Sequence, residues 1–340
     1  PNVRLCVAHE ALGVTAAEGR GRVTGVRIAP IGGRGPVEAV EGDLVVDATG
    51  RGSRAPAWLA ELGYAPPEEE RVQIGLGYAT RFYRRRQEHL GGAKMMLVTP
   101  TPGLHRGAIV LAQEGERWIM TLLGYQGDRP PTDDASFEEF ARSLPAPDVY
   151  DLVRQAEPLG DPVPATFPAN QRRHYERLTR FPDGLLVTGD AICSFNPMYG
   201  QGMSVAAAEA AALEECCAGG PERLGFRFFQ RASEVVDLAW GVTAGNDRRM
   251  LAPGADQSAR SRLLQWYMGR LHVAARREPA AALAFLGVTG LMAPPASVLR
   301  PAVALRVLRG NLGARTAARV KLAAAVETHR RALTRSRRSA

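Results

Sequence analysis

The sequence predicts a mixed α/β (α+β) protein that combines a strand–turn–helix part, an antiparallel sheet and a C-terminal helical region. Two apolar strands, which end at Asp47 and at Val187, each lead into a glycine-bearing turn and then a helix, as in a parallel sheet with helices packed on it. Between them, residues 73–125 contain four runs of alternating apolar character, which is typical of half-buried strands. After Cys217 the sequence predicts helices.

The composition is that of a globular protein with a large core. The chain has 340 residues, of which 45% are apolar and 23% are charged, and these values are ordinary for a soluble protein. The four cysteines show neither metal-site spacing nor a disulfide framework and fit a reducing compartment; they are Cys6, Cys193, Cys216 and Cys217. No run is long and apolar enough to span a bilayer. We therefore expect a cytoplasmic protein with no metal site.

The net charge of +8 is concentrated at the C-terminal end. From Arg300 onward the chain has eleven Arg and Lys residues and a single acidic residue, Glu327. A nucleic-acid interface needs its basic residues on a folded module with stacking aromatics or a known motif, so we expect no nucleic-acid partner. The basic tail is either solvated or, together with the C-terminal helices, makes weak contact with a membrane surface or an acidic partner.

The first 64 residues are expected to form a meander followed by the first glycine turn. Runs rich in Val and Ile predict antiparallel strands over Val3–Ala8, Val23–Ile31 and Val37–Val46. The last of them continues into the run DATGRGSR, Asp47–Arg54, and a helix through Trp58–Leu62 follows. A glycine turn after a buried strand is where doubly wound sheets bind ligands, although many such turns only reverse the chain.

The middle section predicts an antiparallel sheet. The four runs are QIGLGYATRFY, AKMMLVTP, GAIVLAQ and RWIMTLLGY, which start at residues 73, 93, 107 and 117. Alternate residues of these runs either line a substrate cavity or pack in a core, and core packing is favoured for each taken singly. They include Met95, Leu97, Trp118, Met120 and Leu122.

Two short helices and a return strand connect this sheet to the second turn. The helices are expected from Ser136 and over Asp148–Ala156, and the strand over Pro162–Asn170. The polar run at residues 170–175 is interpreted as an exposed connection. That interpretation is favoured over an acid–base role for two of its side chains, His174 and Tyr175.

The stretch Gly184–Cys217 contains the strongest candidate site. An apolar run ends at the turn Gly189-Asp190, and two glycines, Gly200 and Gly202, precede a long alanine-rich helix. The unpaired amides at the start of such a helix favour negative charge, and a single carboxylate in front of it suits the hydroxyl groups of a sugar or sugar alcohol. Taken alone, the stretch fits a plain strand–loop–helix packing unit equally well.

Four helices are predicted after residue 219. Their expected bounds are Leu224–Trp240, Gln257–Arg277, Pro279–Met292 and Ala296–Leu308, from the spacing of apolar residues and the Pro and Gly residues between them. These helices either cap a substrate cavity or lie on a membrane face. Three charged residues are expected between the first two helices, namely Asp247, Arg248 and Arg249.

The residues of the two turns resemble the flavin motifs of one enzyme family. The run Asp47–Arg54 is similar to the central motif of FAD-dependent oxidoreductases. The order GDA, then P-x-x-G-x-G-M, over Gly189–Met203 resembles the second flavin motif of FAD-dependent aromatic hydroxylases and of squalene and polyether epoxidases. The chain departs from phenol hydroxylases at Thr49 and Pro56, where Asp and Arg are usual. The resemblance implies an FAD-binding Rossmann-like domain with an antiparallel substrate-binding sheet and a C-terminal helical region.

The resemblance also implies which residues contact the cofactor. Asp190 would bind the ribityl hydroxyls, and Gly50 and Arg51 would approach the pyrophosphate. Pro197 and the segment 200–203 would lie along the isoalloxazine ring. The full set of implied cofactor-binding residues is Ala48, Thr49, Gly50, Arg51, Gly189, Asp190, Pro197, Gly200, Gln201, Gly202 and Met203. No catalytic side chain is assigned, because in such enzymes the cofactor carries the chemistry.

The implied reaction is monooxygenation of a hydrophobic organic substrate of secondary metabolism, such as a polyketide or isoprenoid. In the resembled family, FAD reduced by NAD(P)H reacts with O₂, and a flavin C4a-hydroperoxide transfers one oxygen atom in hydroxylation or epoxidation. Two alternatives stay open, an FAD-dependent reductase of the geranylgeranyl-reductase type and a non-catalytic remnant of the fold. The W-x-W-x-I-P segment of flavin-dependent halogenases does not occur in the sequence.

One part of the resembled fold has no counterpart in the sequence. This part is the βαβ unit that carries G-x-G-x-x-G, and it needs roughly 30 residues. Neither the unit nor its glycine motif occurs before Asp43. We therefore expect the chain to begin after this unit and to bind FAD poorly or not at all. The expected division is a partial FAD-binding domain (1–64), the substrate-binding sheet (65–175), the flavin-side motif (176–218), the helical region (219–310) and the basic tail (311–340).

Overall fold

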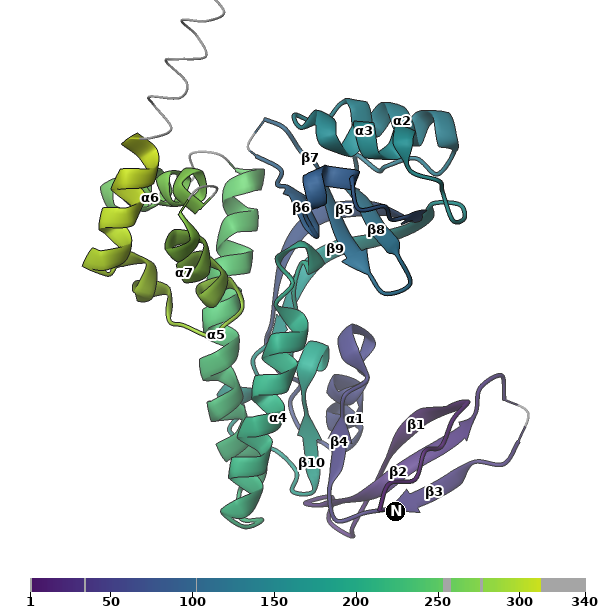
Figure 1. Cartoon of the computed structure of the whole chain (residues 1–340). Helices are drawn as coiled ribbons and strands as arrows, with labels where there is room; N and C mark the ends of the chain where they lie inside the picture. The colour runs from purple at the N-terminus through teal and green to yellow at the C-terminus, as the bar shows by residue number, and fades with distance from the viewer. Residues whose placement is uncertain (1, 34, 102, 253–257, 276–277, 313–340) are drawn as a thin grey trace, which may run out of the picture. The chain divides into compact units, whose positions relative to one another are not determined.

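The structure, a computed structural model, describes residues 2–33, 35–101, 103–252, 258–275 and 278–312 (Figure 1). The chain divides into two compact units, Pro1–Pro253 and Gly254–Ala340. Helices and strands are both abundant, which confirms the predicted α/β (α+β) class. The basic tail predicted for residues 311–340 lies outside the described residues except for its first two positions.

The first unit begins with a three-stranded antiparallel sheet. Its strands are β1 (His9–Ala16), β2 (Val23–Pro30) and β3 (Glu38–Glu41), in that order. The strand predicted over Val3–Ala8 is wrong, since Val3 is 78% exposed and the pairing with β2 starts at His9. The turn closed by the Ala17 N–H and the Arg22 carbonyl decides which residues face β2, and this tertiary register overrides local strand preference.

The single strand predicted over Val37–Val46 is in fact two strands in different sheets. β3 pairs antiparallel with β2, whereas β4 (Val45–Asp47) pairs parallel with β10 (Leu185–Val187). The chain changes sheets at Gly42, whose N–H still bonds to β2 at 3.0 Å. Because β4 and β10 are parallel, their carboxyl ends lie at the same edge, where both predicted turns follow.

Each strand of this parallel pair leads through a turn into a helix, as predicted. After β4 come η1 (Gly50–Gly52) and α1 (Ala55–Glu61). After β10 come η4 (Gly189–Ala191), β11 (Cys193–Ser194), η5 (Pro197–Tyr199) and α4 (Gly202–Ala218). Pro56 stands in the first turn of α1, where a residue without an N–H loses no helical hydrogen bond.

A six-stranded antiparallel sheet follows, in the order β11-β9-β5-β8-β7-β6. Its longer strands are β5 (Glu69–Arg84), β6 (Met95–Val98), β7 (Arg106–Gln113), β8 (Arg117–Gly124) and β9 (Val163–Arg173). The four predicted strands and the return strand are therefore confirmed. β9 lies beside β5 and β11, so it connects the sheet to the segment that follows β10.

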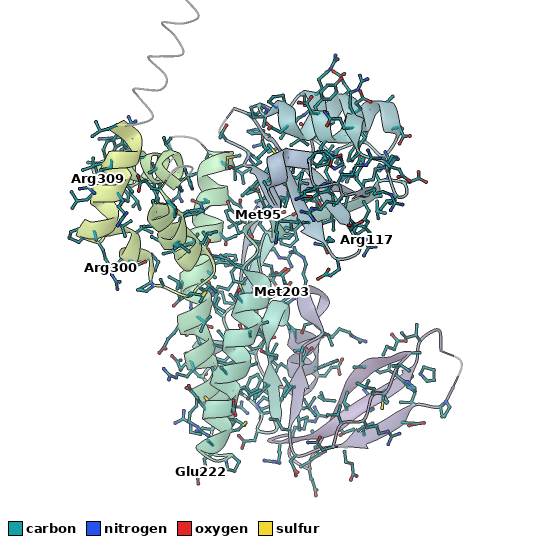
Figure 2. All side chains as sticks on the ribbon, in the orientation of Figure 1. Met95, Arg117, Met203, Glu222, Arg300 and Arg309 are labelled. Carbon is teal, nitrogen blue, oxygen red and sulfur yellow. The ribbon has the colours of Figure 1, made fainter. Side chains whose placement is uncertain are left out.

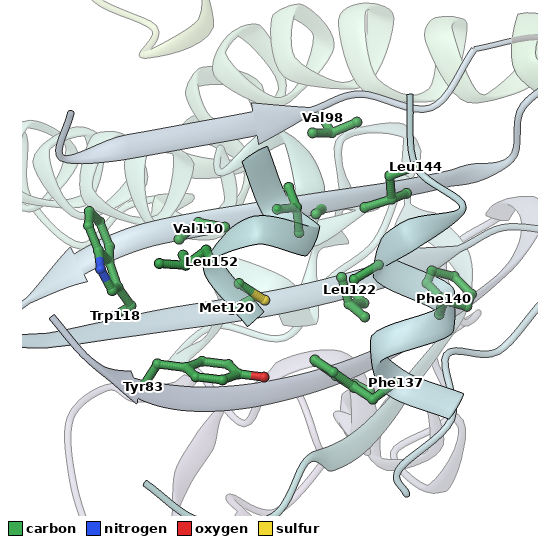
Figure 3. Packing of buried hydrophobic residues seen from close by; sticks show 14 of the residues in the cluster. Tyr83, Val98, Val110, Trp118, Met120, Leu122, Phe137, Phe140, Leu144 and Leu152 are labelled. Atoms are coloured by element: carbon green, nitrogen blue, oxygen red, sulfur yellow. The ribbon is translucent and has the colours of Figure 1, made fainter. Parts of the chain in front are cut away.

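Two helices cover one face of this sheet. α2 (Asp134–Arg142) and α3 (Pro147–Gln155) lie together on it (Figure 1), and their apolar side chains pack on those of the strands (Figure 3). Trp118, Met120 and Leu122 are fully buried there, which confirms core packing for these three. Met95 and Leu97 alternate with core residues, face the opposite side of the sheet, and are 55% and 47% exposed.

The first of these helices starts earlier than predicted. Its N-cap is Asp133, whose carboxylate accepts the Ser136 N–H at 2.9 Å. A capping carboxylate satisfies an amide that the helix itself leaves unpaired. Ser136 therefore lies within the first turn of α2, whereas α3 begins within one residue of its predicted start.

The polar run at residues 170–175 is buried, contrary to the prediction that it is exposed. All six residues are at most 7% exposed. Partners from other elements satisfy their charges. Arg172 pairs with Glu176 at 3.2 Å and with Asp237 at 2.6 Å, and His174 Nδ1 lies 2.7 Å from Glu176. Buried charges need such partners, and these partners cannot be seen from the run itself.

α4 packs along a long helix, α5 (Leu224–Leu251), in the same unit. The sequence predicts that this helix ends at Trp240, with Asp247 and its two neighbours between helices; instead they lie in its last turns. The helix continues because Thr243 and Asp247 extend its buried face and no proline interrupts it. Asp247 is fully buried.

The second unit contains helices around a small apolar core. Its elements are α6 (Ala259–Ala275), α7 (Pro279–Thr289), η6 (Pro295–Leu299) and a helical segment at residues 301–312. The core includes Leu271, Ala274, Ala281, Val298 and Val307. The predicted last helix is split, because its first residues form a 3-10 turn. In the described parts of the chain, each helix is too short or too polar to cross a membrane.

Candidate functional site

The two predicted turns form the walls of one site at the edge of the β4–β10 pair. A Cβ atom on Gly50 would lie 4.0 Å from the Asp190 Cβ, and one on Gly202 would lie 3.6 Å from Asp190 Oδ1. Gly50 and Gly189 have φ angles of +79° and +66°, a backbone region that glycine adopts at little cost. Residues predicted from separate motifs are thus brought together around Asp190.

Asp47, which is not among the predicted site residues, builds the first turn. Its Oδ1 accepts the Thr49 N–H at 2.9 Å and the Thr49 hydroxyl at 2.6 Å, and its Oδ2 accepts the Ser53 hydroxyl at 2.6 Å. The Thr49 side chain is therefore used within the turn. Of Thr49, the backbone is what remains available to a ligand, and the neighbouring Ala48 is exposed.

Asp190 presents its carboxylate on the exposed side of the second turn. Its Oδ2 accepts the Ser194 hydroxyl at 3.3 Å, and it interacts electrostatically with Arg51. Desolvation raises the pKa of Asp190, whereas the Ser194 hydrogen bond and the Arg51 charge lower it. An ionised carboxylate only accepts hydrogen bonds, so Asp190 is suited to a ligand that carries hydroxyl groups.

Arg51 is fixed by β9. Its guanidinium donates to the Ala169 carbonyl and lies 4.7 Å from the centre of the Phe167 ring. Burial, followed by the charges of Arg71 and Arg173, lowers the pKa of Arg51. A cation that is crowded by other cations favours an anionic ligand group nearby.

Arg173 joins the two turns and is missed by the sequence analysis. Its Nη1 donates to the Ala191 carbonyl at 2.8 Å and its Nη2 to the Arg51 carbonyl at 3.2 Å. Its Nε donates to Glu69 at 3.3 Å. Arg173 lies in a polar run, and such a run predicts an exposed segment rather than a buried contact between two turns.

Glu209, on α4, supports the second turn from the buried side. Its Oε2 accepts the Gly189 N–H at 2.5 Å and the Thr188 hydroxyl at 2.8 Å. Its Oε1 is buried without a hydrogen-bond partner in the described structure. Burial raises the pKa of Glu209, and the hydrogen bonds from Gly189 and Thr188 lower it. The signal in the sequence is a lone acid inside the run AAAEAAA.

We predict that Glu209→Gln removes a pH dependence of stability. Because burial raises the pKa of Glu209 above its ordinary 4.5, the folded chain binds this proton more tightly than the unfolded chain does. Stability is therefore lost as pH rises from about 4.5 through the folded pKa, by roughly 1.4 kcal/mol for each tenfold difference in proton affinity between the two states. Glutamine keeps the acceptor without the charge.

Urea unfolding at pH 5 and pH 8 checks this prediction. Glu209→Gln should gain stability relative to the parent chain at the higher pH, whereas Glu214→Gln, at an exposed position of the same helix, should follow the parent chain. Parallel pH profiles for Glu209→Gln and the parent chain would show that burial of this carboxyl does not oppose its ionisation.

The loop at residues 195–202 and the start of α4 contain the other predicted residues. Pro197 and Gly200 are exposed, and Met203 is 86% exposed at the start of α4 (Figure 2). Gln201 is 1% exposed, and its Oε1 accepts the Thr243 hydroxyl at 2.8 Å, so this predicted residue is buried and its side chain is held by α5. No side chain caps α4, which leaves its first amides for a ligand.

Solved structures of flavin-dependent enzymes are similar to this chain. The flavin-dependent brominase Bmp2 aligns with a TM-score of 0.56 and 13% identity, over 83% of this chain and 64% of that one. OxyS, an anhydrotetracycline hydroxylase from Streptomyces rimosus, aligns with a TM-score of 0.53 and 18% identity, over 85% and 53%. The chain has the fold of flavin-dependent hydroxylases and halogenases. The fold predicted from the two motifs is thus confirmed.

One curated protein is similar in sequence. Protein Rv3254 of Mycobacterium tuberculosis is 36% identical over 176 residues, which are 52% of this chain and 37% of that protein. The chain therefore spans little more than a third of the length of this relative, and 64% and 53% of the two solved structures named above. No model of a protein family matches the sequence.

Proposed function

We propose that the chain acts as an FAD-dependent monooxygenase on a hydrophobic organic substrate. The observation that carries the proposal is the position of Asp190 between Gly50 and Gly202, at the carboxyl edge of a parallel strand pair. This is the edge at which doubly wound sheets bind nucleotides. Similarity to the structure of a flavin-dependent brominase supports a flavin cofactor.

The residues present fit the ring and ribityl parts of FAD. Asp190 offers an acceptor to ribityl hydroxyls, and the uncapped start of α4 offers amides to the electron-rich edge of a reduced ring. Arg51 supplies a cation for the pyrophosphate side. In the described residues, no three His, Cys, Asp or Glu side chains are placed to hold a metal ion. When bound, reduced flavin activates O₂ for transfer of one oxygen atom, and we propose NAD(P)H as the reductant.

The open face of the six-stranded sheet is the proposed wall of the substrate cavity. Opposite the face covered by α2 and α3, it presents apolar side chains that are 37% to 65% exposed, namely Phe82, Met95, Leu97 and Val163. Phe167 lies on the same face and contacts Arg51. An apolar wall beside a flavin suits an apolar substrate and excludes water from the reaction.

Isotope labelling tests the reaction class. The chain is incubated with FAD, NADPH and an apolar isoprenoid alkene or phenol under ¹⁸O₂, and the products are analysed by mass spectrometry. A monooxygenase incorporates one ¹⁸O atom and gives no product without O₂. Anaerobic saturation of the alkene would instead identify a reductase. The absence of both products, at an FAD concentration shown to saturate the chain, would favour a non-catalytic remnant.

A further inference from the structure

One face of α5 contacts both ends of the loop at residues 195–202. Trp240 packs against Phe195 with ring centroids 6.4 Å apart. One turn further along, the Thr243 hydroxyl donates to Gln201 Oε1 at 2.8 Å. Asp247 follows four residues later, on the same face of the helix. The loop that carries Pro197 and Gly200 is thus held from the side opposite to its exposed residues.

Asp247 is the centre of these contacts. Asn196 Nδ2 lies 3.1 Å from each of its carboxylate oxygens, and Asn170 Nδ2 lies 2.6 Å from Oδ2. The Tyr125 and Tyr199 hydroxyls each lie 3.1 Å from Oδ1. Burial raises the pKa of Asp247, and the hydrogen bonds, with that of Asn170 first, lower it. Every partner can donate, so a carboxylate that only accepts satisfies them together.

Asn196 transmits these contacts to the backbone of the loop. Its Oδ1 accepts the Met198 N–H at 3.1 Å, which caps η5, and its own N–H donates to Asn170 Oδ1 at 2.6 Å. Asp247, Asn170 and Asn196 therefore form a closed set of hydrogen bonds around the start of the loop. Moving the loop would leave a fully buried carboxylate short of donors, which is costly.

We propose that Asp247 is a positioning residue that holds the loop at residues 195–202 in its flavin-binding conformation, with Thr243 holding the far end. This inference rests on the proposed function, in which the loop lies along the isoalloxazine ring. A loop that is already fixed before binding loses no conformational freedom when the flavin binds, and its amides are held in the position that the ring requires.

Hydrogen exchange of the loop amides in the chain without flavin tests the positioning role by itself. In Asp247→Asn, an NH₂ group replaces one carboxylate oxygen. This NH₂ group then faces the side-chain NH₂ groups of Asn170 and Asn196, so donors meet a donor instead of an acceptor. We expect exchange of amides 198–202 to accelerate about tenfold, the factor for one buried hydrogen bond, while α4 and β8 keep their protection. Thr243→Val, which is milder and isosteric, should accelerate residues 201–202 only.

Two further variants separate positioning from a general loss of stability. Asp237→Asn makes the same change on the same helix but affects the pair with Arg172, so loop exchange should stay at the parent rate. The double variant Asn196→Asp/Asp247→Asn restores a carboxylate opposite a donor and should recover most of the protection. Unchanged loop exchange in Asp247→Asn, or a uniform rise throughout the chain, would overturn the inference.

Riboflavin affinity is measured on the same variants. It should fall about tenfold in Asp247→Asn, fall less in Thr243→Val, and recover in the double variant. If the parent chain binds no flavin, the proposed function fails, while the exchange data still decide whether Asp247 holds the loop. If the loop loosens but flavin affinity is unchanged, the loop is held by Asp247 and the flavin-related part of the inference is wrong.

Discussion

Replacing Asp190 by alanine is expected to lower flavin affinity about 10- to 100-fold, the range for lost hydrogen bonds to a charged group. Asp190 is the exposed carboxylate between Gly50 and Gly202, and within the described residues its side chain accepts one hydrogen bond, from Ser194. Its removal should therefore change the free energy of unfolding by less than about 0.5 kcal/mol. Fluorescence titration with riboflavin and urea unfolding measure the two quantities separately.

The pH dependence of binding gives a second test of Asp190. Since desolvation raises its pKa above the ordinary 3.8, flavin affinity should fall as pH is lowered through that raised pKa, and Asp190→Asn should not show this fall. Asp183→Ala, at another exposed aspartate outside the two turns, serves as the control. Equal affinity of Asp190→Ala and the parent chain would remove Asp190 from the site.

Replacing Arg173 by methionine is expected to cost about 3 kcal/mol of stability and also to weaken flavin binding. The Arg173 side chain is 8% exposed and pairs with Glu69, whose side chain is 28% exposed; removing one partner of a pair that is buried on both sides costs about 3–5 kcal/mol. We expect a stability cost at the lower end of this range, because Glu69 keeps its contacts with Arg71 and Gln171. Arg173 also ties the carbonyls of Arg51 and Ala191 together, so its loss should separate the two turns.

Arg172→Met is the matched control for this variant. Arg172 is the neighbouring buried arginine, but it pairs with Glu176 and Asp237 rather than with the turns. Both variants should lose stability in urea, whereas flavin affinity, measured where both are folded, should fall only in Arg173→Met. If both variants bound flavin equally well, Arg173 would have no special role in the site.

Local patterns predicted most elements of the fold, because strand alternation and helical spacing are properties of short segments. The exceptions are positions where a distant partner decides. β1 starts at His9 because β2 sets its register, and the strand predicted over Val37–Val46 divides because β4 needs a parallel partner. α5 continues beyond Trp240 because its later residues also find a buried environment.

The residues of the candidate site also fall into two groups, those that a local motif shows and those that act through a distant partner. The glycines of the site and Asp190 belong to two continuous motifs, so the sequence shows them directly. Arg173 and Asp247 act through contacts with residues 122 and 51 positions away, Arg51 and Asn196 respectively. Glu209 acts across 20 residues, on Gly189. A single sequence does not show which distant residues pair, and a charged residue in it predicts exposure. For Glu209 the sequence shows only that the acid is isolated among alanines.

Titration of the 340-residue chain with riboflavin, with ADP as competitor, tests most directly whether Asp190 and the loop at residues 195–202 form the ring and ribityl side of a flavin site. Such a site predicts weak but saturable quenching of flavin fluorescence, which Asp190→Ala reduces and which ADP does not reverse, because Asp190 and the loop contact the ring and ribityl chain. A folded chain that shows no saturable quenching, or one from which ADP displaces riboflavin, would contradict it.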